Sequence, residues 1–237
     1  MAVFTVMGDV DPLLHVQLQQ GESVYAESDA MVMAEDTLDV EGSLGNSGLL
    51  GAIMRRVTQE ESFFLQRIIA SRGSGDLLLA HAIPGGVHVL DVGPSQYLLT
   101  DGAFLACSEQ VTLESAMQGV GNALFGGTGG FMIMRTAGNG QVAVAGFGST
   151  FLMDIEPGRP VTIDNDHLVA WDSQIHYEVA VSTTKRGFLR EMFSAATTGE
   201  ALVLKLSGRG KILICSRNKK SFLQWMAAET RTQEKSS

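Results

Sequence analysis

The chain has 237 residues, 45% of them hydrophobic, and a formal net charge of −9 at pH 7. A chain of this length buries roughly 70–75% of its unfolded surface, so it can build a large core. The excess of 26 acidic over 17 basic side chains disfavours nucleic acids and anionic membranes as partners, because the averaged field repels their phosphates. With 5 prolines and 7% aromatic residues, the composition is typical of a globular protein.

The N-terminal stretch, MAVFTVMGDVDPLL, lacks the basic start and long apolar run of a secretory signal. Nowhere does the chain contain an uninterrupted apolar run long enough to span a membrane. Cys107 and Cys215 each lie within a short apolar run, AFLACS and KILICS, where a free thiol behaves as a small core residue. We therefore expect no membrane span and a cytoplasmic location with reduced cysteines.

One phrase recurs along the chain at steps of 72 and 65 residues. An aspartate precedes each of the apolar runs AMVMAE, GAFLAC and HLVAWD; these aspartates are Asp29, Asp101 and Asp166. Downstream of each run come a glycine turn and another strand-like run: SGDLLLAH, NGQVAVAG and RGKILICS. Several signals in one order at nearly constant spacing indicate a threefold internal repeat.

Most predicted elements are short strands. Runs such as Val142–Ala145, Tyr177–Val181 and Ile212–Cys215 are rich in branched residues and bounded by turn-forming residues. The turns GSGD, AGNG and SGRG predict hairpins between the strands that flank them. The spacing leaves no room for helical crossovers between most strands, so the sheets are expected to be antiparallel.

Each copy of the repeat carries an apolar insertion between the shared phrase and the glycine turn. In the first and third copies the apolar residues are spaced as on one face of a short helix, and the second copy has a shorter run of apolar residues at the same place. The interaction candidates are Leu49, Leu50, Ile53, Met54, Leu124, Phe125, Phe188, Leu189, Met192 and Phe193. These insertions either plug the open end of a barrel or sandwich, or form an apolar surface for a partner or another subunit.

These patterns predict a mainly β fold with few short helices, built from three repeats in a pseudo-threefold arrangement around a shared core. A single β domain would span residues 1–215, with repeats at about 13–85, 86–149 and 150–215. Residues 216–237 form a tail that could adopt a short docked helix. Its apolar side chains are Phe222, Leu223, Trp225 and Met226.

Several segments carry a resemblance to a known family: GNSGLLGAIMRR, EESFFLQRI, GDLLLAHAIPGGVHVLDV, YLLTDGAFLACSEQVTLES and GEALVLKLSGRGKILICSRN. From about Val16 to Asn218 the chain resembles the bacterial members of the mitochondrial-biogenesis family named for altered inheritance of mitochondria, member twenty-four. The resemblance implies a β-sandwich or double-stranded β-helix fold, similar to that of the tryptophan RNA-binding attenuation protein. It also implies a link, in the mitochondrial members, to inner-membrane organisation rather than to a reaction, and it brings no set of catalytic residues.

The sequence contains no motif for catalysis or cofactor binding. His81 and His88 could face each other across the turn at Pro84–Gly86, but two imidazoles without a third ligand make a poor metal site. The cluster GGTGG at Gly126–Gly130 lacks the lysine and the helix of a phosphate loop. The repeated aspartates are expected to form turns, because an active site places its acid and base in different environments. We therefore expect no enzyme activity, no metal and no cofactor.

The sequence favours a non-enzymatic scaffold or protein-interaction module that self-associates through its apolar insertions, as a homo-oligomer or with a protein partner. A second hypothesis is a small-molecule sensor that binds an amphipathic or aromatic ligand inside a β-barrel. A third is a cupin-like metal-dependent enzyme. Light scattering, thermal-shift screening and elemental analysis distinguish these hypotheses.

Overall fold

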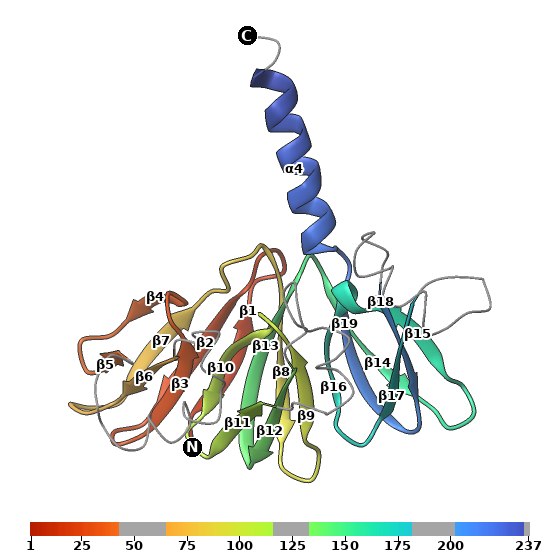
Figure 1. Ribbon diagram of the computed structural model, residues 1–237. Helices are drawn as coiled ribbons and strands as arrows, with labels where there is room; N and C mark the ends of the chain where they lie inside the picture. The colour runs from red at the N-terminus through yellow and green to blue at the C-terminus, as the bar shows by residue number, and fades with distance from the viewer. Residues whose placement is uncertain (43–64, 116–132, 182–201, 235–237) are drawn as a thin grey trace.

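A computed structural model describes residues 1–42, 65–115, 133–181 and 202–234 of the chain (Figure 1). Within these ranges the fold is mainly antiparallel β-structure, as the sequence predicts. The described helices are a short 3-10 helix, η1 (Asn165–His167), and the α-helix α4 (Lys219–Glu234). The strands lie in open sheets, and none of the described sheets closes into a barrel.

The described strands fall into three segments that follow an initial strand, β1 (Val3–Met7). The first segment contains β2 (Leu13–Leu18), β3 (Ser23–Glu27), β4 (Met31–Ala34), β5 (Asp39–Gly42), β6 (Leu65–Ile69) and β7 (Gly75–Leu79). The second contains β8 (Gly85–Val92), β9 (Tyr97–Thr100), β10 (Phe104–Ser108), β11 (Val111–Ser115), β12 (Ile133–Gly138) and β13 (Gly140–Phe147). The third contains β14 (Thr150–Ile155), β15 (Val161–Asp164), β16 (Leu168–Asp172), β17 (His176–Val181), β18 (Leu202–Ser207) and β19 (Gly210–Cys215).

The same antiparallel pairings occur within each segment. The sixth strand pairs with the first and the third, and the fifth strand pairs with the second and the fourth. In the first segment these pairs are β2–β7, β4–β7, β3–β6 and β5–β6. The matching pairs are β8–β13, β10–β13, β9–β12 and β11–β12 in the second segment, and β14–β19, β16–β19, β15–β18 and β17–β18 in the third. A bulge also recurs in the third strand, at Met31/Met33, Phe104/Ala106 and Leu168/Ala170.

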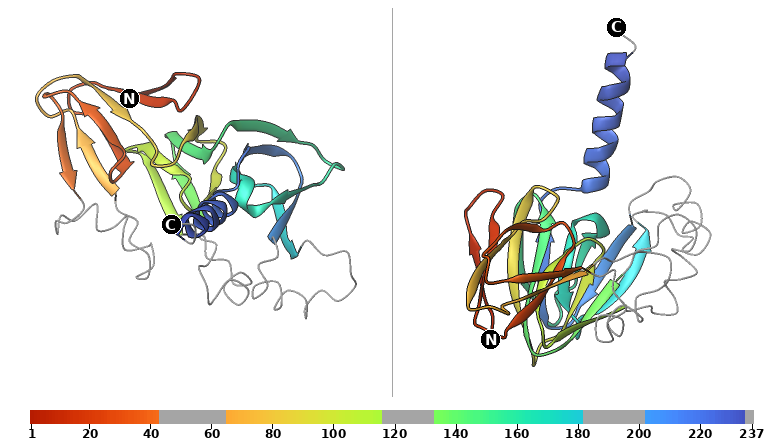
Figure 2. Two further views of the ribbon diagram at one scale, coloured as in Figure 1. Left: turned by 90° about the horizontal axis from the view of Figure 1, so that it is seen from above. Right: turned by 90° about the vertical axis from the view of Figure 1, so that its left-hand side faces the viewer.

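Two further pairings, β3–β10 and β9–β16, join neighbouring segments. The strand orders are β1-β2-β7-β4 in sheet A, β5-β6-β3-β10-β13-β8 in sheet B, β11-β12-β9-β16-β19-β14 in sheet C, and β15-β18-β17 in sheet D. The segments form an open row, with the N-terminal sheet at one end and the C-terminal sheet at the other (Figures 1 and 2). The predicted pseudo-threefold arrangement around a shared core stays a prediction.

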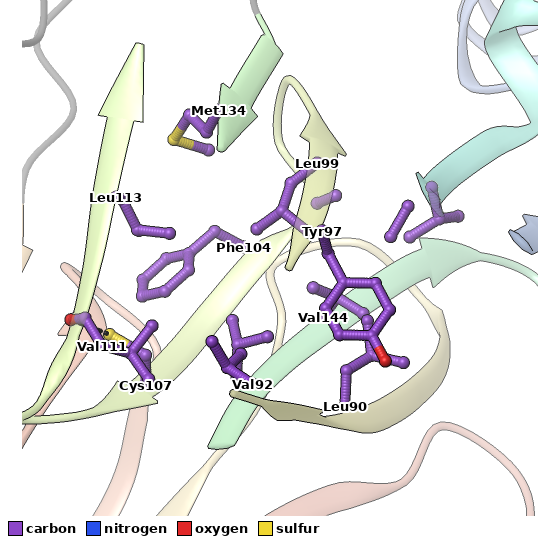
Figure 3. Close-up of a cluster of buried hydrophobic side chains, with 14 of the residues drawn as sticks. Leu90, Val92, Tyr97, Leu99, Phe104, Cys107, Val111, Leu113, Met134 and Val144 are labelled. Atoms are coloured by element: carbon purple, nitrogen blue, oxygen red, sulfur yellow. Dashed lines mark hydrogen bonds between the residues drawn. The ribbon is translucent and has the colours of Figure 1, made fainter. Parts of the chain in front are cut away.

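A separate cluster of buried side chains fills each space between neighbouring sheets. Val16 and Leu77 of sheet A belong to one cluster with Leu105 of sheet B, and Trp171 of sheet C belongs to another with Leu204 of sheet D. Between sheets B and C, Phe104 of β10 lies among side chains of the facing strands, including Leu113 and Met134 (Figure 3). The hydrophobic core is therefore layered along the row of sheets.

The position of a strand in this row explains its sequence pattern. Every residue of β10 and β16 is buried, because these central strands of sheets B and C have a core cluster on each face, and they are accordingly continuous apolar runs. In β2 the residues Leu14, Val16 and Leu18 are buried, whereas His15 and Gln17 between them are more exposed. This alternation is expected for sheet A, which has a neighbouring sheet on one face.

The glycine turns do not form hairpins, so that prediction is wrong. The strands on either side of each turn, β6 and β7, β12 and β13, and β18 and β19, lie in different sheets. At Gly138, whose φ is 94°, an added Cβ would lie 2.1 Å from the carbonyl oxygen of Gln110. Glycine marks a tight change of direction, but it does not determine whether the flanking strands pair with each other or with other partners.

All three repeated aspartates lie between the second and third strands of their segments. Counted from the shared bulge, Asp29 matches Gly102 rather than Asp101, and both Asp29 and Gly102 have a left-handed φ, 69° and 70°. Aspartate tolerates this conformation better than most residues. In the third segment Asp166 lies in η1, where its N–H donates to the side chain of Asp164. These residues form turns, as expected.

Candidate interaction surfaces

The apolar residues predicted as interaction candidates lie outside the described residues: Leu49, Leu50, Ile53, Met54, Leu124, Phe125, Phe188, Leu189, Met192 and Phe193. Their role stays a prediction. Each insertion joins the fourth and fifth strands of its segment, and these strands pair with each other as β5–β6, β11–β12 and β17–β18. All three insertions therefore depart from the same point of the repeated pairing pattern.

The base of α4 is fixed to η1 and to the end of β13. Asn218 caps the helix: its Oδ1 accepts the N–H of Ser221 at 2.8 Å, and its Nδ2 donates to Oδ2 of Asp166 at 3.1 Å. The N–H of Arg217 donates to the carbonyl oxygen of Phe147 at 3.2 Å. Beyond this base the helix points away from the sheets (Figures 1 and 2).

Helix α4 exposes large apolar side chains: Phe222, Leu223, Trp225 and Met226. The i, i+3 and i+4 spacing of Phe222, Trp225 and Met226 gathers them on one side of the helix. Phe222 contacts Phe147, with ring centroids 5.1 Å apart, while Trp225 remains 58% exposed. The expectation that this tail docks on the domain is therefore wrong. No helix in the described ranges combines the length and apolar content needed to cross a bilayer.

An open concavity lies at the base of α4, lined by Phe147, Ser216, Arg217, Asn218, Ser221, Phe222 and Trp225. The rings of Phe222 and Trp225 are 6.0 Å apart and provide its apolar side. A guanidinium and hydroxyl groups beside aromatic rings suit a small amphipathic or aromatic anion, because polar groups orient a ligand that apolar groups bind.

Two strands also expose consecutive apolar side chains, which the sequence interpretation missed. These are Met31, Val32 and Met33 of β4, and Phe151, Leu152 and Met153 of β14. The sequence equates AMVMAE, which contains β4, with the buried runs GAFLAC and HLVAWD. The signal that separates them is position in the chain: β10 and β16 each follow a segment that covers them, whereas β4 belongs to the first segment.

Of the two histidines singled out in the sequence, His81 forms hydrogen bonds with the backbone and His88 is partly buried in a strand. Nε2 of His81 donates to the carbonyl oxygen of Gly102 at 2.9 Å, and Nδ1 accepts the N–H of Ile83 at 3.2 Å. His88 lies in β8, where burial lowers the pKa of its imidazole. Burial also raises the pKa of the Glu27 carboxyl, and the nearby His81 offsets part of this increase. Within the described ranges, no group of three or more His, Cys, Asp or Glu side chains is placed to hold a metal ion.

Both cysteines are free and buried, as the sequence predicts. Burial raises the pKa of the Cys107 thiol to about 12, and it raises the pKa of the Cys215 thiol as well. The thiolate is the nucleophilic form of cysteine, so these protonated thiols act as core residues.

The repeated pairings and layered cores define a β-sandwich-like class of protein. Within this class, the chain belongs to the family Mitochondrial biogenesis AIM24, which it matches over residues 4–217. It is 35% identical over 216 residues to an uncharacterised protein of Streptococcus pyogenes serotype M6, covering 89% of this chain and 84% of that protein. It is also similar to the crystal structure of a Streptococcus pyogenes protein, with a TM-score of 0.77, 31% identity, and coverage of 97% of this chain and 100% of that one. The family resemblance drawn from the sequence is confirmed.

Proposed function

We propose that this protein is a non-enzymatic scaffold or protein-interaction module that self-associates or binds a protein partner. The observation that supports this proposal best is the exposed apolar face of α4, which projects from the sheets (Figure 2). Aromatic residues and methionine are enriched at protein interfaces, where their burial contributes most of the binding energy. A helix that is held at its base and projects from the described sheets presents such side chains to a partner.

The apolar insertions form a second part of this proposal. They depart from equivalent places in the three segments, and their composition is that of a buried or partner-bound surface. Leu50 represents the first insertion and Phe193 the third. A charge at either position would remove apolar contacts and place a desolvated carboxylate at the interface.

Size-exclusion chromatography with light scattering over a concentration series tests this function. We expect the wild-type chain to form an oligomer, and we expect Leu50→Asp, Phe193→Asp or Trp225→Asp to lower its mass. Val10→Asp is the matched control, because Val10 is 85% exposed in the loop between β1 and β2. A strict monomer at every concentration, unchanged by these substitutions, would contradict self-association.

Binding of a small molecule is a second candidate function, supported by the concavity at the base of α4. The described sheets are open, so this surface replaces the barrel interior as the expected place for an amphipathic or aromatic ligand. A ligand that binds the folded state raises the melting temperature by mass action. Thermal-shift screening should therefore find aromatic acids that stabilise the wild type but neither Arg217→Ala nor Trp225→Ala. A shift that persists in both variants would place the ligand elsewhere.

We further propose a cytoplasmic location and no enzyme activity. Two free, buried thiols suit a reducing compartment. A cupin-like metal enzyme ranks last, and stoichiometric metal in the purified protein, measured by elemental analysis, would reverse that order.

A further inference from the structure

The two end sheets are complementary parts of the two central sheets. Sheets B and C have the same strand order when each strand is numbered by its position within its segment. The fourth, fifth and second strands of one segment are followed by the third, sixth and first strands of the next segment. Sheet D consists of the fourth, fifth and second strands of the third segment (β17, β18 and β15). Sheet A contains the third, sixth and first strands of the first segment (β4, β7 and β2), followed by β1. Placed with β15 beside β4, sheets D and A reproduce the order of B and C.

The third strands differ in burial in the way this complementarity predicts. Val32, Leu105 and Val169 occupy the same bulge position in β4, β10 and β16. Leu105 is 0% and Val169 3% exposed, whereas Val32 is 54% exposed. All three side chains are apolar, so composition does not explain the difference. The difference is the neighbouring segment: Leu105 lies in the core between sheets A and B and Val169 in the core between sheets B and C, whereas β4 lies at the end of sheet A, which has a neighbouring sheet on one face among the described strands.

The second strands show the same contrast. In β3 four consecutive residues are buried, and all of β9 is buried. In β15, which ends sheet D, no residue is buried. Within the described ranges, the strands that join segments are therefore buried, and the equivalent strands at both ends of the row are more exposed.

We propose that β15 of one copy pairs antiparallel with β4 of a second copy, so that sheets D and A merge into one continuous sheet. This pairing deepens the proposed self-association by naming a surface that carries it. In the chain, β4 and β15 belong to opposite ends of the row (Figure 1), so the partner strand comes from another copy. An open edge with apolar side chains is a template for strand addition. The contact is head-to-tail, and it propagates into a ring or a filament.

The internal pairings give the register of this contact. Tyr25, Leu98 and Thr162 are equivalent, because they lie opposite the basic residues Arg67, Arg135 and Lys205. Cys107, Trp171 and Ala34 are equivalent, because each lies three residues after the start of the shared bulge. Tyr25 pairs with Cys107 and Leu98 pairs with Trp171. By the same rule, Thr162 of one copy lies opposite Ala34 of the next.

The backbone of β4 is oriented for this pairing. The N–H of Glu35 donates to the carbonyl oxygen of Asp76, the residue that follows Gly75 in β7, at 3.1 Å. Successive residues of a strand direct their backbone groups to opposite sides. Ala34 therefore presents its N–H and carbonyl group to the open edge, where the partner strand would bond to them.

A disulfide between copies tests the register. Ala34→Cys chains are mixed with Thr162→Cys chains under oxidising conditions, and the products are separated without reductant. Opposite residues of an antiparallel pair lie within disulfide reach, so a covalent dimer is expected. In the control mixture Thr162→Cys is replaced by Arg159→Cys, which lies in the exposed turn before β15, and little dimer should form. The native cysteines are buried and do not compete.

Light scattering on Val32→Lys separates this pairing from other modes of self-association. The substitution places a charge on an exposed side chain, so the fold is retained while the edge is blocked. We expect Val32→Lys to lower the oligomer mass and Val10→Lys to leave it unchanged. An oligomer that survives Val32→Lys, with no disulfide between Ala34→Cys and Thr162→Cys chains, overturns the edge pairing but not self-association. A wild-type monomer that forms no such disulfide overturns both.

Discussion

Trp171 provides a direct test of how the space between sheets C and D is filled. Its side chain is fully buried and packs edge-on against Tyr177, with ring centroids 5.6 Å apart and an interplanar angle of 77°. Its Nε1–H is buried without a hydrogen-bond partner in the part of the chain that the structure describes. Two effects of opposite sign therefore meet at one residue: apolar packing stabilises the fold, and an unpaired polar group destabilises it.

Trp171→Ala removes the ring and leaves a cavity, so the free energy of unfolding should fall by about 3–5 kcal/mol. Trp171→Phe retains an aromatic ring against Tyr177 and removes the indole N–H. Burying an N–H without a partner costs about 1–3 kcal/mol, which offsets part of the lost packing. We therefore expect Trp171→Phe to cost less than about 2 kcal/mol.

Urea denaturation followed by far-UV circular dichroism measures both losses as shifts of the midpoint. Trp225→Phe is the control, because the chain has 2 tryptophans and Trp225 is exposed, so its replacement should change stability by less than about 0.5 kcal/mol. Equal losses for Trp171→Phe and Trp171→Ala would refute the contribution of the unpaired N–H. A loss below about 1 kcal/mol for Trp171→Ala would refute the packing of sheets C and D.

Three further predictions concern the turns and the thiols. Gly138→Ala should lower the free energy of unfolding by at least about 2 kcal/mol, because the added Cβ would clash with the Gln110 carbonyl oxygen. Gly102→Ala has no atom within 4 Å of its Cβ, so it should lower this free energy by only about 1–2 kcal/mol, for its left-handed φ. Equal urea midpoints for the two variants would contradict this. Cys107 should react with a thiol reagent only as fast as the protein unfolds, so labelling in native buffer at the rate of a free thiol would argue against its burial. Burial raises the pKa of the Cys107 thiol from 9.0 to about 12, so the unfolded state loses this proton at a lower pH than the folded state. The free energy of unfolding should therefore fall as pH rises from 9 to 12. An equal fall in Cys107→Ala would contradict the assignment of this pH dependence to Cys107.

The strands could be predicted from the sequence, but their partners could not. A continuous apolar run such as Phe104–Ser108 identifies a strand that is covered on both faces. An alternating run such as Leu13–Leu18 identifies a strand that is covered on one face. The turn at Gly138 marks a change of direction, yet a short-range signal does not specify whether the chain stays in one sheet. Pairing depends on residues far apart in the chain, as in β3–β10, where Tyr25 lies opposite Cys107.

Exposure at the ends of the row was equally hard to predict. Val32 and Leu105 occupy equivalent positions in similar apolar runs, and the sheet that faces Leu105 makes it buried while Val32 is exposed. Trp225 belongs to an apolar side of a helix, a pattern that docked and projecting helices share. Local composition therefore identified which residues are apolar, while the succession of segments decided which of them are covered.

Hydrogen exchange of the backbone amides of β4 and β15 tests the account most directly. If sheets D and A merge between copies, the amides of β4 and β15 that point to the open edges, that of Ala34 above all, should exchange slowly at concentrations where the protein is assembled and quickly after dilution. Val32→Lys should exchange quickly at both concentrations. Fast exchange of both strands within a stable assembly would mean that copies meet elsewhere and that the edges are not the joining surface.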